Sequence, residues 1–205
     1  VASDGVSVSR VAISGDVVVA GATSDDSTAI NAGAVYVFRT TDGGATYDQV
    51  AQRVSPAAQG SGNFGYSVAI DGDTVVIGAY LKDSFSGAAY VFRTSDGGAT
   101  YGQVAKLTAS DGDVWDYFGQ SVAIDGATVV IGAWGDDDGG TDSGSVYVLR
   151  TSDGGATYVE VAKLTASDGA YEDLFGQSVA INGATVVVGA SQSRKLQYGL
   201  CPSLD

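Results

Sequence analysis

The chain has 205 residues, 44% of them hydrophobic, and carries a net charge of −14 at pH 7. This composition supports an ordinary hydrophobic core, so we expect a folded chain rather than a disordered one. Only ten Lys and Arg residues stand against 24 Asp and Glu residues, which argues against a nucleic-acid partner because its phosphates would be repelled. No apolar run reaches the ~20 residues that cross a bilayer, and no signal peptide is evident. We therefore predict no membrane insertion.

Two sequence phrases recur along the chain in a fixed order. The phrase Phe-Gly-x-Ser-Val-Ala-Ile begins at Phe64, Phe118 and Phe175, and a shortened copy without Phe-Gly begins at Val11. The phrase Thr-x-Asp-x-Gly-x-Thr-Tyr occupies residues 40–47, 94–101 and 151–158. A repeat length of about 50 residues indicates a propeller or a linear array, in which each unit buries its apolar faces against its neighbours.

Each complete repeat is predicted to form four antiparallel strands. In the repeat that begins at Phe118, apolar and β-branched runs place these strands at residues 121–124, 128–133, 145–150 and 159–165. The fold class that follows is all-β: a β-propeller-type array of four-stranded antiparallel blades with about 3.5 repeats, either part of a ring or completed by another chain.

The repeats define the domain organisation. The blades are assigned to residues 6–54, 64–108, 118–165 and, incompletely, 175–190. Together they fill residues 1–190, and residues 191–205 form a tail outside the repeat. Cys201 in this tail is the only cysteine, so no disulfide can form within the chain.

The Thr-x-Asp-x-Gly-x-Thr-Tyr phrase is predicted to form a hairpin turn. Its Asp is expected to accept a hydrogen bond from the backbone N–H two residues on, and its second Gly to supply a positive φ. The residues concerned are Asp42, Gly44, Asp96, Gly98, Asp153 and Gly155. Because they recur in every repeat, we interpret them as structural, since a catalytic Asp would be expected only once.

Both phrases resemble known propeller motifs. The turn phrase resembles the Asp-box, a hairpin between the third and fourth strands of blades in several propeller families. The Phe-Gly phrase, with Val-Ile-Gly-Ala at 76–79 and Ala-Tyr-Val-Phe at 89–92, resembles the FG-GAP repeats of integrin α-subunit heads and many secreted proteins. The resemblance extends over residues 6–190 and implies a non-catalytic recognition or scaffold module, extracellular or at the cell surface.

The calcium site of cation-binding FG-GAP blades is not expected here. Those blades carry an Asp-rich loop between their first and second strands, whereas the corresponding links in this chain, such as residues 70–74, are turns too short to supply six to eight oxygen ligands. One calcium candidate remains, the loop from Asp136 to Asp142, and the alternative is a solvated loop. The acidic groups of the links between blades, among them Asp111, Asp113 and Asp116, are expected in solvent-facing turns. No other cofactor is predicted.

Four aromatic residues lie in or beside the variable loops: Tyr80, Trp115, Tyr117 and Trp134. Two interpretations stay open, because these side chains could seal the joins between blades or form an aromatic rim that binds a partner. Repeat proteins place their variable loops on one face, which favours a binding surface there.

These observations predict a protein or glycan partner, and a chain that associates with another chain or belongs to a longer polypeptide. Two rival functions are a structural subunit of a larger assembly and a glycoside hydrolase, since Asp-boxes also occur in sialidases. The enzyme is disfavoured because Arg39, Arg93 and Arg150 share one repeat position and are not expected to converge on one substrate. The absence of histidine also removes the usual base that activates a Ser or Cys nucleophile.

Overall fold

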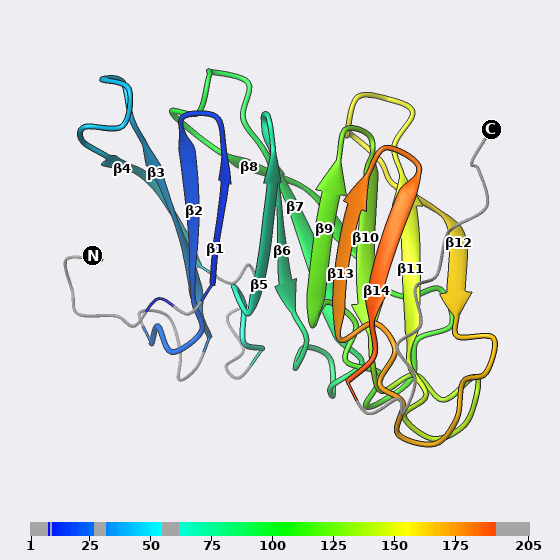
Figure 1. Cartoon of the computed structure of the whole chain (residues 1–205). Coiled ribbons are helices and arrows are strands. Elements are labelled where there is room, and N and C mark those ends of the chain that lie inside the picture. The colour runs from blue at the N-terminus through cyan, green and yellow to red at the C-terminus, as the bar shows by residue number, and fades with distance from the viewer. Residues whose placement is uncertain (1–7, 9, 27–31, 55–61, 192–205) are drawn as a thin grey trace.

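The computed structural model describes residues 8, 10–26, 32–54 and 62–191, and all its regular elements are β-strands (Figure 1). Blade 1 consists of β1 (Arg10–Ser14), β2 (Val17–Ala22), β3 (Ala34–Arg39) and β4 (Asp48–Val54). Blade 2 consists of β5 (Ser67–Asp71), β6 (Thr74–Ala79), β7 (Ala88–Arg93) and β8 (Gly102–Leu107). Blade 3 consists of β9 (Ser121–Asp125), β10 (Thr128–Ala133), β11 (Ser145–Arg150) and β12 (Val159–Thr165). Blade 4 is a two-stranded sheet of β13 (Ser178–Asn182) and β14 (Thr185–Gly189).

The fold class predicted from the sequence is confirmed, with three four-stranded antiparallel sheets followed by half of a fourth. Within each sheet the strands follow one another in chain order, as hairpins require. The sheets do not merge: among the described residues one isolated β-bridge, between Gly87 and Phe118, joins two blades, and the other backbone hydrogen bonds across blades connect loops rather than strands. The first strands β1, β5, β9 and β13 contact one another in sequence, so the blades stand side by side as in a propeller.

Most of the hydrophobic core lies between the blades, and one small cluster of Ala22, Ala34 and Tyr36 lies within blade 1. One cluster joins Val35 and Val37 of blade 1 to Ile77 and Tyr90 of blade 2. Equivalent clusters lie between blades 2 and 3 and between blades 3 and 4. The second strands of blades 2 and 3 are therefore buried on both faces, which explains the continuous apolar runs in β6 and β10.

Glycines fix the distance between neighbouring blades. A Cβ atom on Gly87 would overlap the carbonyl oxygen of Phe118, and Gly33 and Gly144 meet Phe64 and Phe175 in the same way. All three glycines have φ between 78° and 86°, a conformation that costs other residues energy. The Phe-Gly phrase of each blade is thus seated on a glycine of the preceding blade, which is why these residues repeat.

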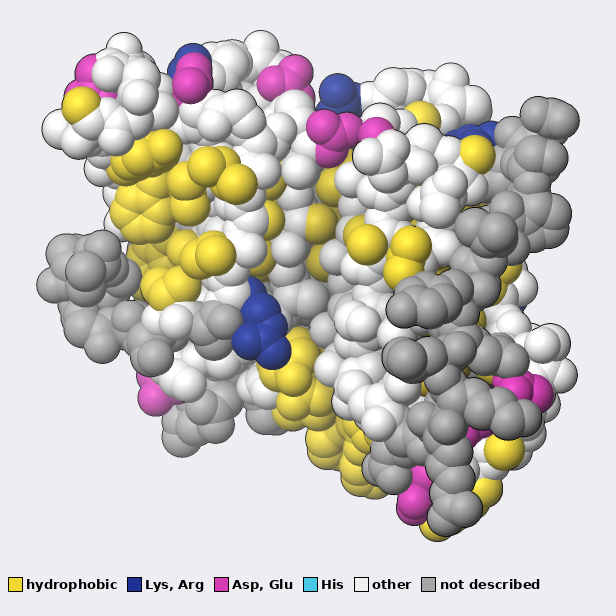
Figure 2. Space-filling view, in the orientation of Figure 1, with side chains coloured by type: hydrophobic (Ala, Val, Ile, Leu, Met, Phe, Trp, Pro, Cys, Tyr) yellow, Lys and Arg dark blue, Asp and Glu magenta, His cyan; other side chains and the backbone are white. Residues whose placement is uncertain are grey.

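The two ends of the array expose apolar side chains that are covered elsewhere. Ile13 of β1 is 64% exposed, whereas its equivalent Ile70 in blade 2 is 9% exposed. At the other end, Val187 of β14 is 46% exposed, whereas its equivalents Val76 and Val130 are buried. Figure 2 shows hydrophobic side chains gathered over the strands of blade 1. Among residues 8–191 as far as they are described, neither end face is covered by a further blade such as covers the same positions inside the array.

Some expectations fall on residues that the structure does not describe. These include the start of the first blade at residues 6 and 7, and the tail at residues 191–205 with Cys201, of which only Ser191 is described. In the described part of the chain, no helix is present that could cross a membrane.

Candidate recognition face

The blades have two ends with different chemistry (Figure 1). One end, here called the turn edge, carries the three Thr-x-Asp-x-Gly-x-Thr-Tyr turns that connect the third and fourth strands. The opposite end, here called the loop face, carries the loops between the second and third strands and the links between blades. The turn edge repeats almost unchanged from blade to blade, whereas the loop face does not.

On the turn edge, the hydrogen bonds differ from those expected. The Asp42 carboxylate accepts hydrogen bonds from the backbone N–H of Thr46 at 2.9 Å and from its hydroxyl at 2.6 Å, so it reaches four residues on rather than two. The N–H of Gly44 donates instead to the hydroxyl of Thr40 at 2.8 Å. The first Thr of the phrase, not the Asp, therefore closes the turn around the glycine.

The same bonds recur in the other two turns. Thr100 and Thr157 donate to Asp96 and Asp153, and the N–H groups of Gly98 and Gly155 donate to Thr94 and Thr151. The second glycines have φ of 93° to 95°. Hydrogen bonds from the second Thr side chain and backbone, and from the first Thr, hold the pKa of each Asp well below its usual range. These carboxylates are committed to the turn and are unsuited to proton transfer.

The loop face carries a continuous group of aromatic side chains, here called the aromatic strip: Tyr66, Tyr80, Phe85, Trp115, Tyr117 and Trp134. Tyr117 stacks on Trp134 with ring centroids 4.4 Å apart and planes 12° apart. Phe85 stacks on Trp115 at 4.2 Å and 8°. Tyr117 connects the two stacked pairs, since its centroid lies 6.2 Å from that of Trp115. The predicted rim residues Tyr80, Trp115 and Trp134 therefore lie in one strip, joined through Tyr117.

Arg10 extends the strip toward blade 1. Its guanidinium carbon lies 5.1 Å from the ring centroid of Tyr66, and Tyr66 packs on Tyr80 at 4.3 Å. Trp115 is the most exposed member at 52%, and the other rings are half-buried. In Figure 2 hydrophobic side chains gather at the lower end of the molecule, below β6 and β9, next to a basic side chain. Sequence reasoning missed Tyr66 and Phe85, because neither stands out without the contact across blades.

The backbone that presents the strip is the same at two successive junctions between blades. At the junction of blades 2 and 3, the N–H of Tyr117 donates to the carbonyl of Phe85 at 2.9 Å. At the junction of blades 3 and 4, the N–H of Leu174 donates to the carbonyl of Asp142 at 3.0 Å. These four residues have φ between 54° and 71°. The strained backbone is therefore a property of the repeat, and only the side chains differ.

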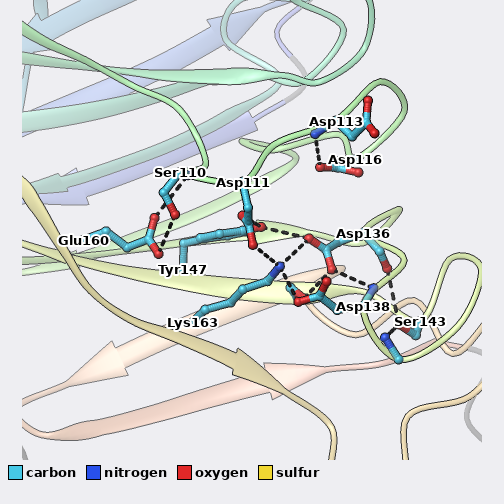
Figure 3. Close-up of polar contacts among 12 residues, drawn as sticks. Ser110, Asp111, Asp113, Asp116, Asp136, Asp138, Ser143, Tyr147, Glu160 and Lys163 are labelled. Atoms are coloured by element: carbon cyan, nitrogen blue, oxygen red, sulfur yellow. Dashed lines mark hydrogen bonds and ion pairs between the residues drawn. The ribbon is translucent and has the colours of Figure 1, made fainter.

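A second cluster lies beside the loop face in blade 3, here called the lysine cluster: Asp111, Asp136, Asp138, Tyr147 and Lys163 (Figure 3). The Lys163 ammonium lies 2.7 to 2.8 Å from all three carboxylates. The Tyr147 hydroxyl lies 2.8 Å from both Asp111 and Asp136, which share its single proton. Asp136 is 4% exposed, so the expectation of a solvated loop is wrong at this residue.

The lysine cluster sets the ionisation of its members. Burial alone would lower the pKa of Lys163, but hydrogen bonds to Asp111, Asp136 and Asp138 outweigh it and raise that pKa. Burial would likewise raise the pKa of Asp136, but hydrogen bonds from Lys163, Ser145 and Tyr147 outweigh it and lower that pKa. Lys163 and Asp136 are therefore both charged at neutral pH, and the Tyr147 hydroxyl, whose pKa is raised by burial and by the two carboxylates it contacts, keeps its proton.

The lysine cluster engages carboxylates that were considered as calcium ligands in the loop from Asp136 to Asp142. Asp136 and Asp138 are ion-paired with Lys163, and Asp137 accepts a hydrogen bond from the N–H of Asp142. Within residues 62–191 and the other described ranges, no group of three or more His, Cys, Asp or Glu side chains is arranged to hold a metal ion. An ammonium group thus occupies the position toward which these carboxylates point.

Among the acidic residues of the link between blades 2 and 3, Asp111 and Asp113 are exposed as expected, whereas Asp116 is not. Asp116 is buried, and its carboxylate accepts a hydrogen bond from the N–H of Asp113 at 2.6 Å. Burial, opposed by that hydrogen bond and assisted by Asp136 and Asp113, raises the pKa of Asp116 to about 6. The interpretation of Asp116 as a solvent-facing turn residue is therefore wrong, because its buried carboxylate folds back onto its own link. Asp111 stays about half exposed while it pairs with Lys163.

A sequence signal for the lysine cluster did exist. Asp25 occupies the position of Asp136 in blade 1, and its carboxylate accepts a hydrogen bond from Tyr36 at 2.6 Å, as Asp136 does from Tyr147. The intervening copy carries Lys82 at this position, which hides the recurrence. Two copies with the same Asp–Tyr spacing indicate a structural pair in blades 1 and 3.

The arginines do not form a shared site. Arg39 lies against Gly97 and Gly98 of the second turn, and Arg93 lies against Gly154 and Gly155 of the third turn. Each therefore packs on the turn of the following blade. The Nε atom of Arg93 is buried without a hydrogen-bond partner, beside a cavity of about 690 Å³ that is also lined by Asp73 and Asp153.

Comparison with known proteins agrees with the fold. The family model of the FG-GAP repeat matches residues 47–92, 101–149 and 158–199, more than half of the chain. The chain therefore belongs to the FG-GAP repeat family, whose repeats are typical of extracellular or surface proteins and whose propellers are generally non-catalytic. No curated protein sequence matches the chain significantly.

Among solved structures, Sqt1 of Saccharomyces cerevisiae, a WD40 propeller, matches with a TM-score of 0.50 and 12% sequence identity. The match covers 80% of this chain and 36% of Sqt1, so this chain spans well under half of that propeller. The similarity concerns the fold alone: the blades are arranged as in a propeller.

Proposed function

We propose that this chain is a non-catalytic recognition module, extracellular or at the cell surface, whose loop face binds a protein or a glycan through the aromatic strip. The observation that carries this proposal is the difference between two junctions built on one backbone. The junction of blades 2 and 3 presents Phe85, Trp115 and Tyr117, where the next junction presents Asp142, Glu172 and Leu174. Packing between blades does not require the aromatic residues, because the next junction is assembled without them.

Repeat architecture supports the same conclusion. The elements that hold blades together recur in each copy, as the Phe-Gly phrases and turns do. Residues that are present at only one junction are not required for packing between blades. Aromatic residues are enriched at recognition surfaces. Membership of a family with generally non-catalytic propellers, and the hydrogen-bonded carboxylates of Asp42, Asp96 and Asp153 on the turn edge, support a role without catalysis.

The test exchanges the side chains of one junction for those of the next. The variant Phe85→Asp, Trp115→Glu, Tyr117→Leu is compared with the unaltered chain on a glycan array and in crosslinking to candidate surface proteins. Recognition by the loop face requires at least one ligand that the unaltered chain binds and the variant loses, with an unchanged melting profile. Ligands bound equally by both proteins would place recognition elsewhere.

The end faces favour a second candidate function, a structural subunit of a larger assembly. Val11, Ile13 and Val187 expose apolar area at positions that a neighbouring blade covers inside the array, and exposed sheet faces of this kind favour association. Native mass spectrometry tests this candidate: Ile13→Lys is expected to dissociate any assembly built on the end faces. A particle of the same mass for both proteins contradicts it.

A further inference from the structure

The shape of the aromatic strip limits what it can bind. Its rings form stacked pairs, Phe85 with Trp115 and Tyr117 with Trp134, and the pairs are tilted by 64° to 67° where Tyr117 meets Trp115 and Phe85. Each stacked ring has one face already covered by its partner. The surface is therefore ridged, and it offers ring edges and the outer face of Trp115 rather than a row of free flat faces.

Polar groups in the strip favour a ligand with free carbonyl groups. The Tyr80 oxygen accepts a hydrogen bond from the Nδ2 atom of Asn63 at 3.4 Å, so its own proton can be donated to a ligand. A polyproline II segment has no internal hydrogen bonds, and its carbonyls are available along the whole chain. In other domains such segments dock on surfaces lined by aromatic side chains.

The charge next to the strip favours a basic group in the ligand. Asp142 lies close enough to Tyr117 that, together with burial, it raises the pKa of that tyrosine. The N–H of Glu172 donates to the carbonyl of Thr141 at 2.9 Å, which brings Glu172 next to Asp142, and burial, Asp137 and Glu172 raise the pKa of Asp142. Among the residues that the structure describes, no Lys or Arg forms an ion pair with Asp137, Asp142 or Glu172.

The chain already binds its own cations in this way. Lys163 lies 5.1 Å from the ring centroid of Tyr147 while it pairs with Asp136, and Arg10 lies over Tyr66 at the other end of the strip. A ring and a carboxylate side by side are therefore an arrangement that holds a cation in this protein. The rings of the junction of blades 2 and 3 lie next to the carboxylates of Asp142 and Glu172 at the following junction, and the cation is left for a ligand to supply.

We propose that the aromatic strip binds an extended, proline-rich peptide segment, with a basic residue of that segment placed against Asp142 and Glu172. This rests on the proposed function, since it names the ligand class of the same loop face. The strip is held by hydrogen bonds between blades, and a polyproline II segment is also preformed, so little conformational entropy is lost on binding.

Tryptophan fluorescence gives a direct measurement, because Trp115 and Trp134 are the only tryptophans and both belong to the strip. The probe is a peptide of ten prolines followed by two arginines, without tryptophan. A saturable change in emission is expected, and it should be absent with a Gly-Ser peptide of the same length and charge. No change at millimolar probe, with the protein folded, would overturn the proposal.

Variants locate the binding and separate its two components. Phe85→Asp with Tyr117→Leu keeps both tryptophans and is expected to weaken binding of the probe at least 10-fold. If this double variant is unstable, Trp115→Ala, followed by calorimetry, should weaken binding to the same extent.

Asp142→Asn with Glu172→Gln tests the carboxylates. It should weaken binding of the arginine-bearing probe at least 3-fold and leave binding of ten prolines alone unaffected. Tyr47→Ala, on the turn edge, is the matched aromatic control and should change nothing. Equal binding by all variants would overturn the proposal.

A glycan alternative is distinguished in the same assay. If chitin or cellulose hexasaccharides change the emission and the proline probe does not, the ligand class proposed here is wrong but recognition by the loop face stands. If neither binds, and the glycan array and crosslinking also show no difference between the unaltered chain and the exchanged junction, the proposed function fails as well.

Discussion

The junction of blades 2 and 3 and the junction of blades 3 and 4 share a backbone and differ in chemistry. In both, a Phe-Gly phrase donates its N–H to the carbonyl of a serine in the preceding loop, at Ser86 and Ser143, and both bonds measure 2.9 Å. In both, a serine hydroxyl of the earlier blade donates to the carbonyl of the Phe-Gly glycine at 2.7 Å. The first junction then carries aromatic rings where the second carries carboxylates and Leu174. The comparison teaches that the repeat fixes the frame, while individual copies are free to vary the surface that the frame presents.

The largest effect is expected at the lysine cluster, which ties the link at the first junction to blade 3. Lys163→Met leaves Asp136 buried without its cation, and removal of one partner of a buried pair costs about 3–5 kcal/mol. The control is Lys106→Met, whose pair with Asp83 is exposed, so that its loss costs roughly 0–1 kcal/mol. Urea unfolding of both variants at pH 7 measures the difference, and equal losses would contradict a special role for the cluster.

The effect of Lys163→Met should depend on pH. The cluster lowers the folded-state pKa of Asp136 and Asp111, so its stabilisation is complete above the ordinary Asp pKa of about 4 and is lost as the pH falls through the folded-state values. The difference in the free energy of unfolding between the unaltered protein and Lys163→Met should therefore become smaller as the pH is lowered below about 4, which the same urea unfolding measures in acid.

The shared frame is tested at its glycines. Gly87→Ala and Gly144→Ala each place a Cβ atom on a backbone carbonyl oxygen at a positive φ, and each should cost about 3 kcal/mol from overpacking and left-handed strain. The losses in the free energy of unfolding should agree within roughly 0.5 kcal/mol if the two junctions share the same backbone packing. Gly72→Ala is the control, because it has a positive φ but open space around it, and it should cost only about 1–2 kcal/mol. Thermal unfolding provides the ranking.

Asp116 gives the first junction a pH dependence of its own. Its folded-state pKa of about 6 lies above the ordinary Asp value, so between about pH 4 and pH 6 the unfolded chain binds fewer protons at this group than the folded chain. Asp116 therefore makes stability fall as the pH rises through this window. Asp116→Asn should remove this decrease in the free energy of unfolding between pH 4 and pH 6, and should raise the free energy of unfolding at pH 7 by about 1–3 kcal/mol. A stability profile between pH 4 and pH 7 checks the sign, and an unchanged slope in the variant would contradict it.

The smallest effect on stability is expected where recognition is proposed. Trp115→Glu gives this position the residue type of its equivalent at the next junction, Glu172. The backbone has a positive φ at both positions. Because Trp115 is half-exposed, the loss should be limited to its stacking on Phe85, about 1 kcal/mol. A loss above about 3 kcal/mol by calorimetry would show that Trp115 seals the junction instead.

Much of the fold could be predicted from the sequence, because its strands are short and strongly patterned. In the third repeat the predicted strands at 128–133, 145–150 and 159–165 coincide with β10, β11 and β12. The half blade at the end was also evident, since only two strand patterns follow Phe175. Such local signals are available because hairpin turns connect neighbouring strands within each blade.

The site could be predicted only in part. Tyr80, Trp115 and Trp134 were identified as aromatic residues in variable loops, but their common strip depends on contacts between residues of different repeats. The burial of Asp136 and Asp116 was missed for the same reason, because an acidic loop looks solvated until a lysine from β12 or a distant link covers it.

The sequence by itself determined that this protein is a row of β-sheets, because the periods of its strands, turns and glycines are local properties of the chain. It also determined that the turn edge is structural, since the same residues return in three copies. Only the tertiary structure decided which loop residues meet, because the contact between one blade and the next joins residues about 50 positions apart. That packing turned scattered aromatic residues into one surface, and three separate carboxylates into the partners of a single lysine.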